Sequence, residues 1–253
     1  MGILRGLKNS VAFLTVVPVG MDADGFTQAA TYMPLFPIVG AMIGLICGAL
    51  VWALDLFLPS LITGMLGLGS ILLLTGVHHT DGLLDFGDAI ISHASREDKI
   101  RIMSDPYTGA GGLSLGLVVL ATTALGIAAL DPARVIQSLV GAEAAAKFAM
   151  VFQAWGGKSA HKGLNTPFVK AMHGQWRWPR LAISFGLLLV ISVLGLQFVG
   201  AALALGAILI AGIMLIVSNS AFGGVTGDVM GATNDLTRLV SLLVIVVAER
   251  WAL

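Results

Sequence analysis

Charged residues are scarce in this chain. Asp, Glu, Lys and Arg make up 11% of its 253 residues, against about a quarter in soluble domains. The mean hydropathy of +0.94 excludes a soluble globular domain and indicates an integral membrane protein. The net charge is zero, which leaves no basic surface for nucleic acid. The single cysteine, Cys47, excludes an internal disulfide.

Long apolar runs are what the chain has in abundance. A helix needs about 20 residues to cross the hydrocarbon core. Apolar windows near this length lie at 32–57, 61–77, 112–130, 135–154, 181–198 and 201–222, with a shorter one at 239–252. They predict an all-α, polytopic membrane bundle of about six or seven transmembrane helices, folded as one catalytic domain over residues 1–253. The amphipathic pattern at the N-terminus predicts an additional helix lying at the interface.

The basic residues predict the orientation of this bundle. With the N-terminus in the cytoplasm, one side receives all but three of the 14 Lys and Arg residues, the exceptions being Arg134, Lys147 and Arg250. Cytoplasmic loops carry such an excess. We therefore expect a multi-pass protein of the cytoplasmic membrane whose long polar segments, near 78–111, 155–180 and 223–238, face the cytoplasm. Whether 239–252 crosses the membrane is left open.

The segment from His78 to Asp88, HHTDGLLDFGD, carries the most distinctive chemistry. Its spacing places Asp81, Asp85 and Asp88 on one face of a helix. Three adjacent carboxylates repel one another unless a cation neutralises them, and all-oxygen ligation favours Mg²⁺, Mn²⁺ or Ca²⁺ over zinc. The alternative is an acidic helix start exposed to water, which the helix dipole also favours.

Two further polar segments fall on the same side of the membrane. Asp105 precedes a glycine turn in which Gly109 and Gly111 can offer backbone N–H groups to a phosphate, although a plain loop fits the pattern as well. Asp228 lies among glycines near the start of another predicted helix, with Thr226 as a candidate cap. A second acidic element facing the first would complete a metal site.

Several other polar residues are candidates for catalysis or for binding phosphate. His79 is a candidate catalytic residue, although a histidine at a membrane boundary is more often a solvated cap. Lys147 lies four residues after Glu143, an arrangement that suits either an internal ion pair or a phosphate contact. Arg101 and Arg238 complete the set of candidate phosphate ligands. Acids that bind Mg²⁺, together with cations and N–H groups that bind phosphate, indicate phosphoryl-type transfer.

Four segments, in this order, resemble the motifs of a known family: MPLFPIVGAMIG, LTGVHHTDGLLDFGDAI, REDKIRIMSDPYTGAGG and FGGVTGDVMGA. The chain is similar to the cobalamin synthases, the adenosylcobinamide-GDP ribazoletransferases. The resemblance implies a membrane enzyme that uses Mg²⁺, joins adenosylcobinamide-GDP to α-ribazole or its 5′-phosphate, and releases GMP. It places Asp81, Asp85 and Asp88 at the catalytic centre, and Asp105 and Asp228 at the family's other motif aspartates.

These observations lead to one hypothesis of residue roles and two rival functions. The five aspartates are candidate metal ligands, Asp88 is the candidate general base with Asp85 as its alternative, and Arg101, Lys147 and Arg238 are candidates for stabilising the leaving phosphate. The rivals are a CDP-alcohol phosphotransferase, whose Asp-Gly-x-x-Ala-Arg signature is not matched after Gly82, and a cation transporter. Association into a homo-oligomer is left open.

Overall fold

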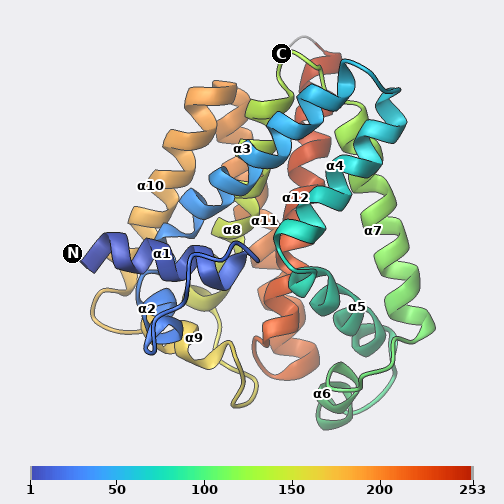
Figure 1. Ribbon diagram of the computed structural model, residues 1–253. Coiled ribbons are helices and arrows are strands. Elements are labelled where there is room, and N and C mark those ends of the chain that lie inside the picture. The colour runs from blue at the N-terminus through green and yellow to red at the C-terminus, as the bar shows by residue number, and fades with distance from the viewer. Residues whose placement is uncertain (1, 252–253) are drawn as a thin grey trace.

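The computed structural model describes residues 2–251 and is built from helices (Figure 1). In chain order they are α1 (Gly2–Leu14), α2 (Gly25–Thr31), the 3₁₀ helix η1 (Met33–Leu35), α3 (Phe36–Asp55), α4 (Ser60–Leu74), α5 (His78–Ile91), α6 (Arg96–Met103), α7 (Ala110–Ala128), α8 (Val135–Gly156), α9 (Thr166–Met172), α10 (Arg177–Leu196), α11 (Phe198–Phe222) and α12 (Gly227–Arg250). Within the described residues, six spans are long and apolar enough to cross a membrane, namely Met33–Asp55, α7, α8, α10, α11 and α12. The predicted polytopic helical bundle is confirmed.

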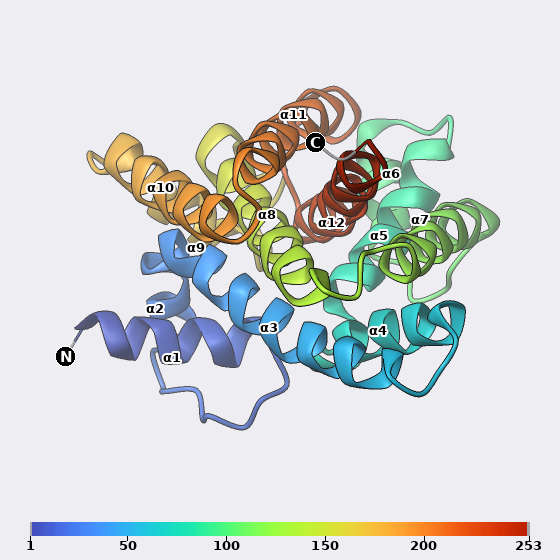
Figure 2. The same cartoon turned by 90° about the horizontal axis from the view of Figure 1, so that it is seen from above.

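Small residues let the central helices approach closely. On α3, Gly40 and Gly44 lie against the backbone of α8, where a Cβ atom would collide with the carbonyl groups of Glu143 and Leu139. Close packing of this kind joins helices in lipid, where burial of apolar surface supplies little driving force. Seen from above, α8 lies between α3 and α11, and α12 lies beside it (Figure 2). Polar groups on α8 and α12 are therefore shielded from lipid.

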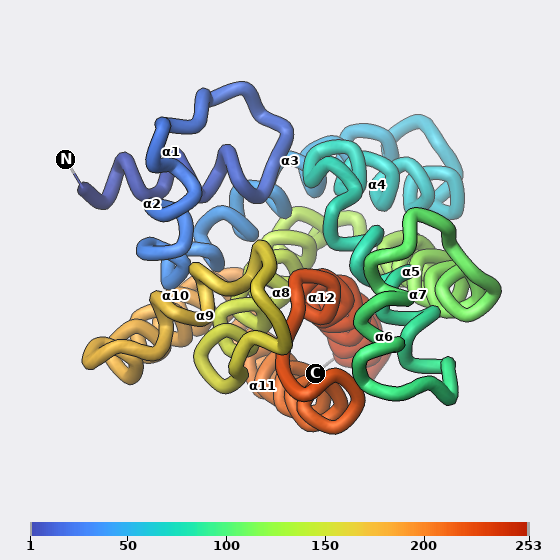
Figure 3. Tube along the Cα trace, turned by 90° about the horizontal axis from the view of Figure 1, so that it is seen from below, coloured from blue at the N-terminus to red at the C-terminus, as the bar shows by residue number. Residues whose placement is uncertain are grey.

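The long polar segments share one end of the bundle. α5, α6, α9 and the start of α12 all lie at the lower end in Figure 1. From below, α12 begins between α5 and α6 on one side and α8 and α9 on the other (Figure 3). At the opposite end, the Asp131 backbone N–H donates to Glu249 Oε2 at 2.9 Å, which places the α7–α8 connection beside the end of α12.

The segment 223–238, which we expected to be polar and to face the cytoplasm, is buried within the bundle over most of its length. Residues from Gly227 onwards form the first half of α12, which continues to Arg250 as a single helix. Asp235 and Arg238 are each only 1% exposed. A hydropathy window misses this half because its charges are buried and paired with one another. α12 thus begins 12 residues before the short apolar window predicted at 239–252. The last residue of that window lies outside the described range.

The junction between α4 and α5 is a sharp bend that the sequence did not predict. The two helices meet at 97°. Gly76 and Val77 both have left-handed backbone angles, with φ of 67° and 64°, a conformation that is rare for a β-branched residue. The bend turns α5 away from the direction of α4, so that α5 packs between the lower parts of α7 and α12 (Figure 1).

α1 lies across the bundle (Figure 1). Ile3 and Leu4 are exposed on one side, while Arg5 and Lys8 form ion pairs with Asp22 in the following loop at 2.8 and 2.9 Å. The Arg5 guanidinium holds the pKa of Asp22 well below its usual range. An exposed apolar side and a paired polar side suit the interfacial position that the sequence predicts.

Candidate active site

Two glycines bring α5 against the start of α12. A Cβ atom on Gly82 would lie 2.8 Å from Asp228 Cα, and one on Gly231 would lie 2.8 Å from the His79 carbonyl oxygen. Real Cβ atoms do not approach backbone so closely, so each helix needs a glycine where it meets the other. The pair sets the separation between the acids of α5 and the acid of α12.

Asp81 and Asp228 line the same cavity, which has a volume of about 410 Å³. Asp81 is exposed and Asp228 is partly buried. The Thr226 hydroxyl accepts a hydrogen bond of 3.1 Å from the Val229 N–H, so the predicted cap of α12 is confirmed. The structure thus brings together two acids that are far apart in the sequence, as a shared site requires.

Asp85 lies one turn after Asp81 and is partly buried. Burial raises the pKa of Asp85 to about 7, and the charges of the neighbouring carboxylates act in the same direction. The carboxylates of α5 and α12 therefore repel one another, and proton uptake by Asp85 relieves part of that repulsion. A bound cation would relieve it too.

Asp88, a predicted metal ligand and general base, is bound to the backbone of α7 in the structure. Its two carboxylate oxygens accept hydrogen bonds from the Gly109 and Gly112 backbone N–H groups, at 2.6 and 2.8 Å. These N–H groups are at the start of α7, where a carboxylate replaces a missing helical acceptor. In this structure Asp88 ties α5 to α7, and the N–H of Gly109 is used by Asp88. Gly111 packs against α5, because a Cβ there would lie 3.0 Å from the Gly87 carbonyl oxygen.

Arg101 and Asp105 lie on the surface at and after the end of α6. Arg101 pairs with Asp98 at 3.1 Å, and its side chain is 82% exposed. Asp105 accepts a hydrogen bond of 3.0 Å from the Tyr107 N–H. Neither residue lines the cavity of Asp81 and Asp228. The structure therefore gives no support to phosphate binding by Arg101 or to metal binding by Asp105.

The structure does not bring Lys147 and Arg238 to the cavity. Both are buried in an internal network, in which Lys147 donates to Asn234 Oδ1 at 2.7 Å and pairs with Glu143 at 3.4 Å. Arg238 pairs with both Glu143 and Asp235. Two cations facing two acids explain how such charges lie between membrane helices. Of the two readings of Glu143 and Lys147, the structure shows the internal ion pair.

His79 lines the cavity, is 7% exposed, and carries an Nδ1 atom with no hydrogen-bond partner among the described residues. Burial keeps the pKa of His79 well below its ordinary value. The ring is therefore neutral at pH 7, with one nitrogen able to accept a hydrogen bond. A role of His79 at the site stays a prediction.

The side of the cavity away from the acids is apolar, and the sequence analysis did not predict it. It is formed by Phe13, Phe26, Phe36 and Phe168, together with Asn165. These residues come from α1, α2, α3, α9 and the segment before α9. No local pattern marks them, since their proximity depends on how the N-terminal helices dock on the bundle.

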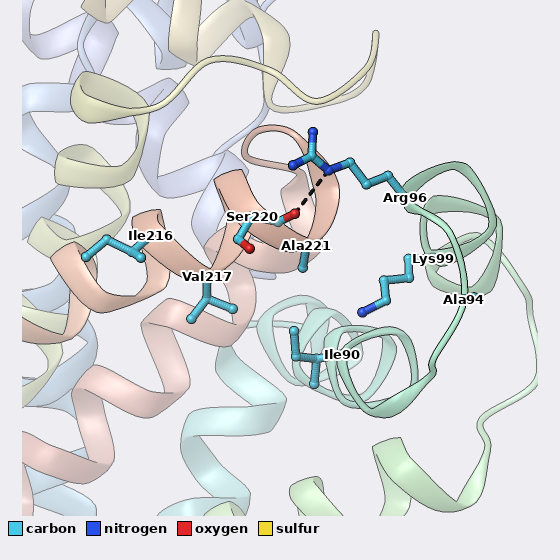
Figure 4. A pocket seen from close by; sticks show the side chains of 8 residues that line it. All are labelled: Ile90, Ala94, Arg96, Lys99, Ile216, Val217, Ser220 and Ala221. Atoms are coloured by element: carbon cyan, nitrogen blue, oxygen red, sulfur yellow. Dashed lines mark hydrogen bonds between the residues drawn. The ribbon is translucent and has the colours of Figure 1, made fainter.

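A second hollow, of about 470 Å³, lies between the end of α5, α6 and α11. Arg96 donates to the Ser220 carbonyl oxygen at 3.0 Å across it, with Lys99 nearby (Figure 4). None of its lining residues is acidic. The cavity with Asp81 and Asp228 is therefore the better candidate active site.

The cavity offers two carboxylates, Asp81 and Asp228, as ligands for Mg²⁺. Among residues 2–251, no three His, Cys, Asp or Glu side chains converge closely enough to hold a metal, so the predicted cage of several aspartates is not formed. Mg²⁺, however, is usually held by one or two carboxylates together with water and substrate phosphates. Asp81 and Asp228 supply such a pair.

Comparison with known proteins shows which family the chain belongs to. A family model described as cobalamin-5-phosphate synthase matches residues 6–246. The chain belongs to the cobalamin synthase family. It is 33% identical to the adenosylcobinamide-GDP ribazoletransferase of Methanococcoides burtonii, over 98% of this chain and 93% of that protein. It is also 33% identical to that of Methanocella arvoryzae, over 95% of this chain and 94% of that protein.

The cobalamin synthase assignment confirms the resemblance of the motifs and makes the chain a transferase of cobalamin biosynthesis. A third relative with the same name, from Prosthecochloris aestuarii, is 31% identical over 93% of this chain and 94% of its own length. No solved structure matches. The family favours the transferase over both rival functions.

Proposed function

We propose that this protein joins adenosylcobinamide-GDP to α-ribazole, or to α-ribazole 5′-phosphate, with release of GMP and with a requirement for Mg²⁺. The names of the relatives that match nearly the whole chain support the two substrates. The observation that carries the proposal is the cavity shared by Asp81 and Asp228. Two acids on helices held together by Gly82 and Gly231 provide the fixed anionic site that phosphoryl transfer requires.

In the proposed reaction, Asp81 and Asp228 would hold Mg²⁺. The metal ion, when bound, supplies positive charge against phosphate oxygens. Asp85 accepts the proton of the ribazole 3′-hydroxyl, whose oxygen forms a bond to the cobinamide-side phosphorus while the bond from that phosphorus to the GMP oxygen breaks. Asp85 lies one turn after Asp81 and is not itself among the residues that line the cavity. We assign the base to Asp85 because it is the carboxylate next to Asp81, and because both oxygens of Asp88 already accept backbone hydrogen bonds.

We place the site on the cytoplasmic side of the cell membrane. The segments at the same end as Asp81 and Asp228 carry most of the basic residues, among them Arg96, Lys99 and Lys158. Arg134 and Arg250 belong to the opposite end. Cytoplasmic loops are enriched in such residues.

The proposal is tested with the full-length protein in lipid nanodiscs. Adenosylcobinamide-GDP is mixed with α-ribazole or its 5′-phosphate, and the products are separated by chromatography. We expect equal amounts of GMP and the joined cobamide, only when both substrates and Mg²⁺ are present. Release of GMP without an acceptor would instead indicate a hydrolase, and the proposal would be abandoned.

A further inference from the structure

The cavity that holds Asp81 and Asp228 has an aromatic side that metal and phosphate binding do not explain. The ring of Phe168 lies 4.8 Å from that of Phe13 and 5.3 Å from that of Phe26, measured between centroids. Phe36 and Phe168 are no more than 2% exposed, whereas Asp81 at the other side is exposed. The cavity thus passes from a polar opening to a buried aromatic interior.

Two buried polar atoms in the lining have no partner within the described residues. Asn165, which is 3% exposed, has an unpaired Oδ1, and His79 has an unpaired Nδ1. The orientation of the Asn165 amide is fixed, because its Nδ2 lies 2.7 Å from the Val225 carbonyl oxygen, which can only accept. Oδ1 is therefore an acceptor facing no protein donor. Unpaired buried acceptors are costly, and a ligand with a hydroxyl or N–H group would satisfy them.

We propose that this aromatic interior binds the flat base of the acceptor nucleoside, with the partly exposed rings of Phe13 and Phe26 packed against the base and Asn165 Oδ1 accepting a hydrogen bond from a ribose hydroxyl. This inference rests on the proposed function, because it names the place of one substrate of that reaction. It assigns Phe13, Phe26, Phe36, Phe168 and Asn165 to the acceptor. The position also places the ribose between the aromatic rings and the two acids.

The chemistry of the lining selects this occupant over the two halves of the donor. The corrin macrocycle with its side chains exceeds a volume of about 410 Å³. Guanine has several donors and acceptors at its edge, and most of them would face phenylalanine without partners, which is unfavourable. The base of α-ribazole, dimethylbenzimidazole, has methyl groups at its outer edge. Aromatic packing and burial of that apolar edge are favourable against phenylalanine.

The test measures acceptor binding and acceptor use separately. Full-length protein in nanodiscs is titrated with radiolabelled α-ribazole in the presence of a metal chelator, and KM values for acceptor and donor are then measured with Mg²⁺. Phe13→Leu and Phe26→Leu keep an apolar lining but remove an aromatic ring. We expect each to weaken α-ribazole binding and to raise the acceptor KM by about three- to tenfold, while the donor KM changes less than twofold. Phe13 and Phe26 are both only partly buried, so either variant tests the proposal even where the other fails to fold.

Phe152→Leu is the matched control, because Phe152 belongs to a separate aromatic cluster with Phe148 and Trp155. It should leave α-ribazole binding unchanged. An α-riboside of adenine should compete at least tenfold more weakly than α-ribazole with the wild-type protein. Turnover with an unchanged acceptor KM in both cavity variants overturns the inference and leaves the proposed reaction intact. Wild-type binding of α-ribazole that Phe26→Leu weakens, without any release of GMP, supports the inference and rejects only the reaction.

Discussion

The Thr80 hydroxyl on α5 donates a hydrogen bond of 2.9 Å to Asp235 Oδ2 on α12, although 155 residues separate them. Asp235 also accepts from Asn234 and pairs with Arg238. The buried ion network is therefore connected to the helix that carries Asp81 and Asp85. This connection helps to fix how α5 packs against α12. It also gives the network a structural part in the site.

Replacing Thr80 with valine tests this connection. Thr80→Val keeps the shape of the side chain but removes the donor, which leaves a buried carboxylate oxygen less satisfied. We expect the free energy of unfolding to fall by about 1–3 kcal/mol, measured by thermal unfolding in detergent. Thr123→Val is the control, because the Thr123 hydroxyl bonds only within its own helix, to the Val119 carbonyl oxygen, and it should cost less than about 1 kcal/mol. Equal losses in both variants would contradict the account.

The ion network predicts a strong effect for Arg238 and its rescue by a second change. Arg238→Met leaves Glu143 and Asp235 with only Lys147 to balance them, and should destabilise the protein by about 3–5 kcal/mol. Adding Glu143→Gln restores one positive and one negative charge. The double variant should therefore unfold at a higher temperature than Arg238→Met alone. If the second change lowers stability further, the charges are not acting as one network.

Close contact between α5 and α12 predicts that Gly82 cannot gain a side chain. In Gly82→Ala the new methyl group would lie 2.8 Å from Asp228 Cα, and α5 must move away from α12. Small displacements of catalytic groups can reduce turnover about 100-fold, and we expect a loss of that order in the transfer assay. Gly69→Ala on α4 is the control, since no atom lies within 4 Å of the added Cβ. Wild-type turnover in Gly82→Ala would show that the separation of the two helices is not critical.

The raised pKa of Asp85 predicts how Mg²⁺ binding depends on pH. In the metal-free protein Asp85 is protonated below about pH 7 and charged above it, and a cation binds better beside the charged form. The affinity for Mg²⁺, measured by calorimetry without substrate, should rise as pH increases towards 7, by at most about tenfold per pH unit, and then level off. In Asp85→Asn the affinity should be lower and nearly constant over this range. A pH dependence that persists in Asp85→Asn would assign it to another group.

Local sequence patterns predicted the elements of the site but not its contacts. The spacing of Asp81, Asp85 and Asp88 correctly predicted a helix, and Thr226 correctly predicted the start of another. The bend at Gly76 and Val77 could not be predicted, because valine rarely adopts a left-handed conformation. The partners of Asp88 could not be predicted either, since they depend on where the start of α7 docks. Likewise, Phe13 and Phe168 meet only through the packing of distant helices.

The most direct test of the central claim, that Asp81 and Asp228 form one Mg²⁺ site for the transfer reaction, is GMP release by three single variants in the same nanodisc preparation. Asp81→Asn and Asp228→Asn should each lose at least about 100-fold in turnover, because each removes one of two fixed ligands. Asp105→Asn should retain turnover within about threefold, since Asp105 lies outside the cavity. Folded Asp81→Asn or Asp228→Asn protein with near-wild-type, chelator-sensitive release of GMP would contradict the account.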